Sequence, residues 1–187
     1  MSLFDVNGFR TRLANGGARP NQFKVDLGGK AGGGDLSSFL VTAASLPGQT
    51  IGTASVFYRG REVKLAGDKV FAPWTTTIIN DSNLAIRSAI EQWMNDIEDN
   101  ATKVGQLSPS QYFSDLIVTQ LDKNGDTDIK TYRLIGAWPT DISEIPLSFD
   151  ANDQLSSFTC TWNYQYFETE ISSVPSFTGV EPPGGVF

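Results

Sequence analysis

The stretch Ser157–Tyr166, SFTCTWNYQY, alternates polar and apolar residues without interruption. Because successive side chains of a β-strand point to opposite faces, one set can enter a core while the other faces water. The apolar set is Phe158, Cys160, Trp162, Tyr164 and Tyr166, and the polar set is Ser157, Thr159, Thr161, Asn163 and Gln165. The pattern predicts a half-buried strand, which we extend to Leu155–Phe167.

The polar face of this strand carries no charge. A solvated sheet face usually includes Lys and Glu, and a catalytic face would carry acids, bases or metal ligands. A neutral face of hydroxyl and amide groups suits a surface past which something slides without sticking. An ordinary outer face that lacks charges is the alternative, and the pattern leaves both interpretations open.

Length and composition predict one domain with a sizeable core. The chain has 187 residues, of which 40% are hydrophobic, and this excludes wholesale disorder. Its formal net charge of −7 argues against tight binding to DNA or an anionic membrane, because phosphate binding needs clustered Lys and Arg. No run approaches the roughly 18 apolar residues of a membrane span, and residues 1–17 have no apolar signal core. We therefore expect a soluble protein that is not exported.

The residue inventory is unfavourable for catalysis. Histidine is absent, which removes the commonest general base and the commonest metal ligand. Cys160 lies between Phe158 and Trp162 and is predicted to be a small core residue rather than a nucleophile. The acidic stretch 122–128 lacks the glycine and glutamate spacing of an EF-hand, and glycines 28–34 lack that of a phosphate-binding loop. We predict no enzymatic activity, no metal and no cofactor.

The other patterns predict a mostly antiparallel β-fold. Strands are expected at 23–27, 38–44, 75–80, 115–121 and 128–137, with a long hairpin over 51–66 that turns near Arg59–Gly60. Asn124–Gly125 is the turn of a second hairpin, and Trp138–Pro139 is expected to end its second strand. Residues 28–34 and 100–111 are expected to be connections without regular structure.

One helix is predicted after the strand at 75–80. Ile86, Ile90, Trp93 and Ile97 recur at helical spacing, and Asp81 or Ser82 can cap its start. The fold class expected is therefore an antiparallel β-barrel or sandwich with one flanking helix. We divide the chain into an N-terminal arm (1–17), the barrel domain (18–168) and an extended C-terminal tail (169–187).

Several short segments carry a family resemblance. They are ARPNQFKV at 18–25, AASLPG at 43–48, LAGDKVFAPWT at 65–75 followed by IIND at 78–81, and GAWPT at 136–140. In this order and spacing they resemble the tail tube proteins of contractile-tailed phages of the T-even type. The resemblance runs from Ala18 to Glu168, and the glycine-rich segment 28–34 and the tail 169–187 depart from the family pattern.

The resemblance implies a structural virion protein whose hexameric rings stack into a tube inside a contractile sheath. Phage DNA would pass through the lumen without specific binding. The implied partners are further copies of the chain, the tail sheath, the baseplate and the tail terminator, with no membrane. The protein would assemble in the host cytoplasm and reside in the virion tail.

The resemblance also implies roles for two sets of residues. The hairpin over 52–66 would contact the adjoining ring, with Tyr58, Arg59, Gly60, Arg61 and Lys64 at or near its tip. This basic tip favours an acidic surface of another subunit over nucleic acid. Because a basic wall would capture phosphates, we expect a neutral or acidic lumen, with Ser157, Thr159, Thr161, Asn163 and Gln165 as one row and Thr75 and Thr77 as a second. Burial of the first row, or its packing against the helix, would contradict this assignment.

Three alternatives accompany this interpretation. A baseplate tube initiator or a type VI secretion tube subunit would keep the fold and change the assembly. A carbohydrate-binding β-sandwich would expose aromatic side chains on one face, whereas those of 157–166 share the expected core face. A hydrolase ranks last because a general base is lacking.

Overall fold

The computed structural model describes residues 17–32, 35–103, 105, 108–125, 127–150 and 152–171. The strands are β1 (Phe23–Asp26), β2 (Val41–Ala44), β3 (Gln49–Tyr58), β4 (Arg61–Phe71), β5 (Trp74–Ile79), β6 (Ser114–Leu121), β7 (Asp128–Ile142), β8 (Ser157–Asn163) and β9 (Tyr166–Ile171). The helices are the 3₁₀-helix η1 (Gly29–Ala31) and the α-helices α2 (Asp35–Leu40), α3 (Ala85–Ile97) and α4 (Pro109–Tyr112).

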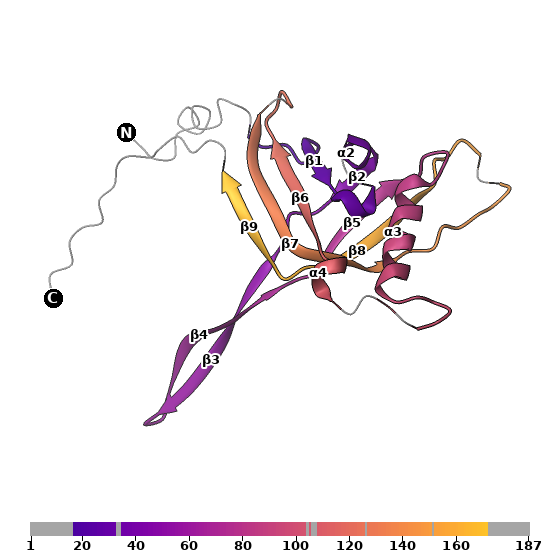
Figure 1. Cartoon of the computed structure of the whole chain (residues 1–187). Coiled ribbons are helices and arrows are strands. Elements are labelled where there is room, and N and C mark those ends of the chain that lie inside the picture. The colour runs from indigo at the N-terminus through magenta and orange to yellow at the C-terminus, as the bar shows by residue number, and fades with distance from the viewer. Residues whose placement is uncertain are drawn as a thin grey trace, which may run out of the picture.

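The strands form one curved antiparallel sheet and one separate hairpin. The sheet has the order β1-β6-β7-β8-β5-β2, with β9 also paired to β7, and β3 pairs only with β4. Figure 1 shows α3 lying beside the sheet and the β3–β4 hairpin projecting away from it. The expected fold class, a mostly antiparallel β-fold with one flanking helix, is confirmed.

Strand β7 joins the two halves of the sheet. Its residues up to Ala137 pair with β6 and those up to Ile135 also pair with β9, whereas its residues from Trp138 pair with β8. Gly136 lies at the junction with a φ of 61°, a left-handed conformation that favours glycine. A Cβ there would also lie 3.2 Å from Cγ of Gln165. The prediction that Trp138–Pro139 ends this strand is wrong, because pairing continues past Pro139 with a shift of register.

The stretch 155–167 is two strands rather than the single one expected. β8 ends at Asn163, and β9 begins at Tyr166 and pairs with the other half of β7. The N–H of Gln165 donates to the carbonyl of Ile135 at 3.0 Å, where the chain passes between the two halves. Tyr166 is consequently half exposed instead of being a core residue.

Residues 169–171, which were assigned to the extended tail, belong to strand β9. Strand β9 continues to Ile171 and remains paired with β7 there. Residues 172–187 of the tail and residues 1–16 of the arm (1–17) lie outside the described residues, so the proposed domain boundaries stay a prediction.

The strand expected over 38–44 begins only at Val41, because residues 38–40 belong instead to helix α2. Ser37 and Ser38 explain this difference, because their hydroxyl groups donate to the carbonyl of Val25 at 3.5 and 3.2 Å. Ser37 Oγ also lies 3.4 Å from the N–H of Leu27 as its acceptor. Helix α2 thereby satisfies polar groups at the edge of β1 that a neighbouring strand would otherwise pair with.

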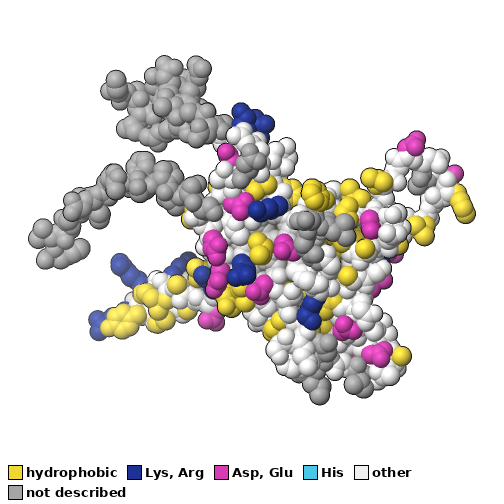
Figure 2. Space-filling model, turned by 45° about the horizontal axis from the view of Figure 1, so that its top comes forward, with side chains coloured by type: hydrophobic (Ala, Val, Ile, Leu, Met, Phe, Trp, Pro, Cys, Tyr) yellow, Lys and Arg dark blue, Asp and Glu magenta, His cyan; other side chains and the backbone are white. Residues whose placement is uncertain are grey.

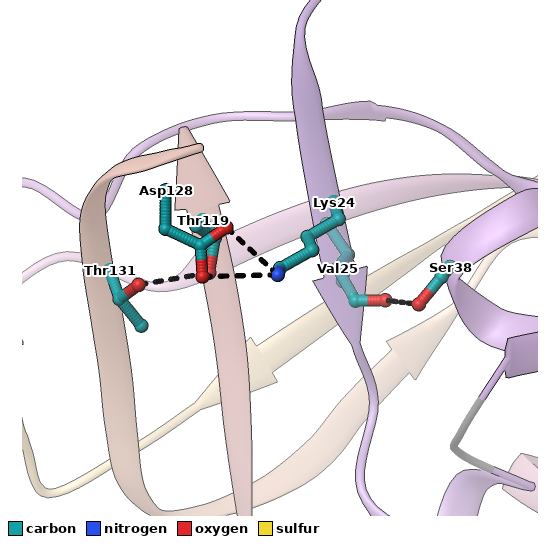
Figure 3. A network of polar contacts seen from close by, with 6 residues as sticks. All are labelled: Lys24, Val25, Ser38, Thr119, Asp128 and Thr131. Atoms are coloured by element: carbon teal, nitrogen blue, oxygen red, sulfur yellow. Dashed lines mark hydrogen bonds and ion pairs between the residues drawn. The ribbon is translucent and has the colours of Figure 1, made fainter. Parts of the chain in front are cut away.

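Strand β1 is also linked by an ion pair to β7, on the other side of β6. Figure 3 shows Lys24 reaching Asp128 across β6, with Nζ 2.9 Å from Oδ1, beside the paired hydroxyl groups of Thr119 and Thr131. Two further short helices occur where connections were expected, η1 in the glycine-rich segment and α4 near residue 110. Residues 33 and 34 lie outside the described part of the glycine-rich segment.

Helix α3 packs on the core as its periodicity predicts. Ile86, Ile90 and Trp93 are buried, and the ring centroid of Trp93 lies 5.7 Å from that of Trp162 on β8. Asp81 Oδ1 accepts a hydrogen bond of 2.8 Å from the N–H of Ala85, as expected of a side chain at the helix start. The inward face of β8 therefore packs against α3.

A substitution at Thr76 tests this core. The hydroxyl of Thr76 accepts the indole N–H of Trp162 at 3.0 Å, and both residues are fully buried. We expect Thr76→Val to lower the free energy of unfolding by about 1–3 kcal/mol, because the indole N–H loses its acceptor. Urea unfolding at fixed protein concentration measures the change. The exposed neighbour substitution Thr75→Val is the control and should change stability by less than about 0.5 kcal/mol; equal effects of the two substitutions would contradict the prediction.

Candidate functional site

The β3–β4 hairpin is the most exposed ordered element of the described residues. Phe57 and Tyr58 near its tip are 76% and 65% exposed. Arg59 and Gly60 form the turn with φ values of 48° and 80°, as in the two-residue turns that join twisted strands. An isolated two-stranded hairpin is only marginally stable in water, so we expect the long β3–β4 hairpin to pack against another surface.

The two faces of the hairpin differ in chemistry. Residues directly opposite one another share a face, and one face combines Ala54, Val56, Tyr58, Arg61, Val63 and Leu65. The other face combines Thr53, Ser55, Phe57, Glu62, Lys64 and Ala66. On the second face the hydroxyl of Ser55 donates to Glu62 Oε1 at 2.6 Å. The structure therefore places Tyr58 and Arg61 on a mainly apolar face and Lys64 on a mainly polar one.

Aromatic packing anchors the base of the hairpin. The ring of Phe71, at the end of β4, lies 6.0 Å from Tyr164 and 5.5 Å from Phe167 between centroids. The indole N–H of Trp74 donates to the carbonyl of Ser45 across the same base. The base is thus fixed to the body while the strands extend away from it.

The neutral row of β8 lies on the outer face of the sheet. Thr161 pairs with Thr75 of β5, and Thr159 pairs with Thr77, so the two predicted rows are adjacent. We call this surface the hydroxyl face; its members are Thr75, Thr77, Ser157, Thr159, Thr161 and Asn163. They are partly or fully exposed, on the side opposite the face that packs on α3. Sequence patterns identified both rows, and only the strand pairing brings them together.

At two positions the composition of the hydroxyl face differs from the predicted row. Gln165, the last residue of the predicted row, lies in the turn between β8 and β9 rather than in the strand. Asp141 of β7 pairs with Thr161 on its other side and brings a carboxylate to the edge of the hydroxyl face. The role of this face as a lumen wall stays a prediction.

Cys160 has the surroundings of a core residue rather than of a nucleophile. Cys160 is fully buried in the core, as predicted. Burial raises the pKa of its thiol far above the ordinary value, and the nearby Asp141 carboxylate raises it further. In the described part of the chain, no three metal-binding side chains cluster, and no helix is long and apolar enough to cross a membrane.

Comparison with known proteins identifies the family. Residues 9–170 match the phage tail tube protein family. Tail tube protein gp19 of Enterobacteria phage T4 is 28% identical over 151 residues, which cover 81% of this chain and 91% of that protein. The tail tube protein of Serratia phage KSP90 is 30% identical over 166 residues, covering 85% and 93%. The chain belongs to the phage tail tube protein family, and the resemblance seen in its sequence is confirmed.

A solved structure agrees with the fold. The sheath-tube complex of the extracellular contractile injection system PVC, in its extended state, contains a chain with a TM-score of 0.63 at 15% identity. The similarity covers 86% of this chain and 97% of that one. The relatives are structural tail tube proteins, so family membership supports a structural role and not an enzymatic one.

The chemistry of Cys160 gives a test of the core assignment. We expect a thiol-specific reagent at pH 8 to label the native protein very slowly and the urea-unfolded protein at once, because the reactive thiolate is both scarce and inaccessible. Absorbance of the released chromophore measures the rate. Ser157→Cys, on the exposed face of the same strand, should label rapidly in the native state. Rapid native labelling of Cys160 itself would contradict the assignment.

Proposed function

We propose that copies of this chain form hexameric rings that stack into the inner tube of a contractile phage tail. The observation that carries the proposal is the β3–β4 hairpin, whose mainly apolar face stands outside the body of the protein. Family membership supports the same function. Phage DNA passes through the lumen of the tube during ejection.

The hairpin supplies the contact between rings. Val56, Val63 and Leu65 are half exposed on one face of it, and apolar surface of this kind marks sites of protein association. Because about half of each side chain is already buried, removing the rest from water stabilises a contact by about 0.7–1.5 kcal/mol per side chain. Six hairpins per ring interface multiply this free energy, so stacked rings hold together firmly.

Edge strands supply the contacts within a ring. Helix α2 covers the edge of β1, whereas β9 and β2 lie at other edges of the sheet. Backbone pairing between edge strands of adjacent subunits forms one continuous circular sheet and occupies edges that would otherwise favour aggregation.

The hydroxyl face lines the lumen. Its hydroxyl and amide groups and the neighbouring Asp141 offer DNA no cationic group, so phosphates are not held at the wall. The outer partners are the sheath, as in the sheath-tube complex of the related PVC fold, together with the baseplate and the tail terminator. The protein assembles in the host cytoplasm and functions in the virion tail.

Electron microscopy of the purified protein tests the proposal. We expect six-fold rings and tubes for the unaltered chain, and rings without tubes for the double variant Val56→Ser/Leu65→Ser, which removes apolar area from one hairpin face. Thr53→Ser/Ala66→Ser, on the other face, is the matched control and should still form tubes. A protein that stays monomeric at all concentrations overturns the proposal. Closed single rings alone would instead favour a baseplate initiator or a type VI-like subunit.

Ejection kinetics test the lumen assignment. We expect Thr159→Lys/Thr161→Lys to slow DNA ejection from assembled virions while tails form normally, because paired ammonium groups attract phosphates. The delay should shrink as salt concentration rises, since salt screens this attraction. Thr159→Ser/Thr161→Ser is the control, and real-time fluorescence of released DNA gives the rate. Unchanged ejection by the Lys variant would contradict the assignment.

A further inference from the structure

A long connection between β7 and β8 forms a second projection. We call its described residues, 143–150 and 152–156, the receiving loop. Leu147 and Phe149 in it are 90% and fully exposed, and Leu155 is also exposed. Figure 1 shows this connection extending from the body on the side away from the β3–β4 hairpin.

The register of the sheet places the two projections at opposite ends of the same strands. Trp74 of β5, which directly follows the hairpin, pairs with Trp162 near the end of β8. At the other end of this pair, Ile79 lies opposite Ser157, which directly follows the receiving loop. If the hairpin extends toward one neighbouring ring, the receiving loop therefore faces the ring on the other side.

The two projections carry opposite charges. The hairpin has four basic residues against two acidic ones: Arg59, Arg61, Lys64 and Lys69, with Glu62 and Asp68. The receiving loop contains Glu144, Asp150 and Asp153, and the sequence from 143 to 156 has no Lys or Arg. Figure 2 shows the corresponding blue and yellow side chains on the hairpin and magenta and yellow side chains on the loop.

The shapes of the two projections are also complementary. The receiving loop borders an open hollow of about 330 Å³. Its lining combines the apolar residues Ile145, Pro146, Leu147 and Leu155 with the polar residues Ser148, Gln154, Ser156 and Ser157. The hairpin presents two exposed aromatic side chains at its tip, Phe57 and Tyr58. Aromatic anchors that fill pockets contribute much of the binding energy of protein interfaces, and complementary charges around them speed association and fix its register.

We propose that the receiving loop of one copy binds the hairpin tip of a second copy in the adjoining ring. An aromatic ring of Phe57 or Tyr58 occupies the hollow, and the basic residues of the tip face Glu144 and Asp150. Because this contact joins two different surfaces head to tail, it repeats without closing and extends the tube. The inference rests on the proposed stacking of rings and names the surface on which the hairpin docks.

Charge reversal with rescue tests this contact. We expect Glu144→Lys/Asp150→Lys to form rings and to lose tubes by electron microscopy, because the acidic surface is replaced by one that repels the hairpin. Adding Arg61→Glu/Lys64→Glu to the same chain should restore tubes. The control is Asp96→Lys/Glu98→Lys. It reverses the charge at two exposed positions, one in α3 and one just after it, and should form tubes.

A cross-linking measurement covers the case in which a charge variant does not fold. Phe57→Cys and Leu147→Cys proteins, mixed before assembly and then oxidised, should give a disulfide-linked dimer, whereas Phe57→Cys mixed with Asp96→Cys should not. Three results would each overturn the contact. They are tubes formed by the Glu144→Lys/Asp150→Lys variant, no return of tubes when Arg61→Glu/Lys64→Glu is added, and no cross-link between Phe57→Cys and Leu147→Cys. If the unaltered chain forms rings and tubes, any of these results overturns the contact and leaves the proposed function in place. If the unaltered chain forms no tubes, both the contact and the proposed stacking of rings are overturned.

Discussion

The burial of Trp162 organises the central part of this protein. Its indole N–H is held by Thr76 of β5, its ring packs beside Trp93 of α3, and its backbone pairs with Pro139 of β7. Because strand side chains alternate, an inward Trp162 sends Thr159 and Thr161 outward. The chemistry of the outer face is thus a geometric consequence of the core. A register slip of one residue would bury hydroxyl groups and expose the indole, so packing maintains the neutral surface.

The second organising feature is the passage of β7 between two groups of partners. Gly136 permits the bend, and the break between β8 and β9 at Tyr164–Gln165 lies opposite it. This corner brings Phe167 and Tyr164 to the end of β4, where they hold Phe71. The long hairpin is therefore anchored at the point where the sheet changes partners. A rigid base allows an extended element to present its tip at a defined position.

The folded chain leaves a large apolar surface uncovered. Its body buries an aromatic and aliphatic core, yet the hairpin and the connection after β7 leave large apolar side chains in water. Edge strands add unpaired backbone groups of the kind that natural proteins normally cover. Proteins that assemble into repeating structures can leave such groups exposed because neighbouring copies cover them. Family membership and these exposed elements lead to the same interpretation of the chain as a building unit.

Local patterns in the sequence determined a large part of this structure. The alternation in 157–163, the helical spacing from Ile86 to Ile97, the Asn124–Gly125 turn and the long hairpin each depend on neighbours along the chain. The two threonine rows and the buried Cys160 followed from the same alternation. Periodicity suffices there because backbone geometry sets which side chains share a face.

Tertiary contacts decided the rest. Helix α2 exists where Ser37 and Ser38 meet the edge of β1, and Gln165 leaves its strand where Ile135 accepts its N–H. The adjacency of the two threonine rows and the opposite placement of the two projections depend on the register between β5 and β8. These features join residues far apart in the chain, and their free energy arises only when the sheet forms. Local periodicity does not predict such contacts. The sequence alone therefore indicated the hairpin and the two threonine rows, and the folded sheet decided how they are arranged.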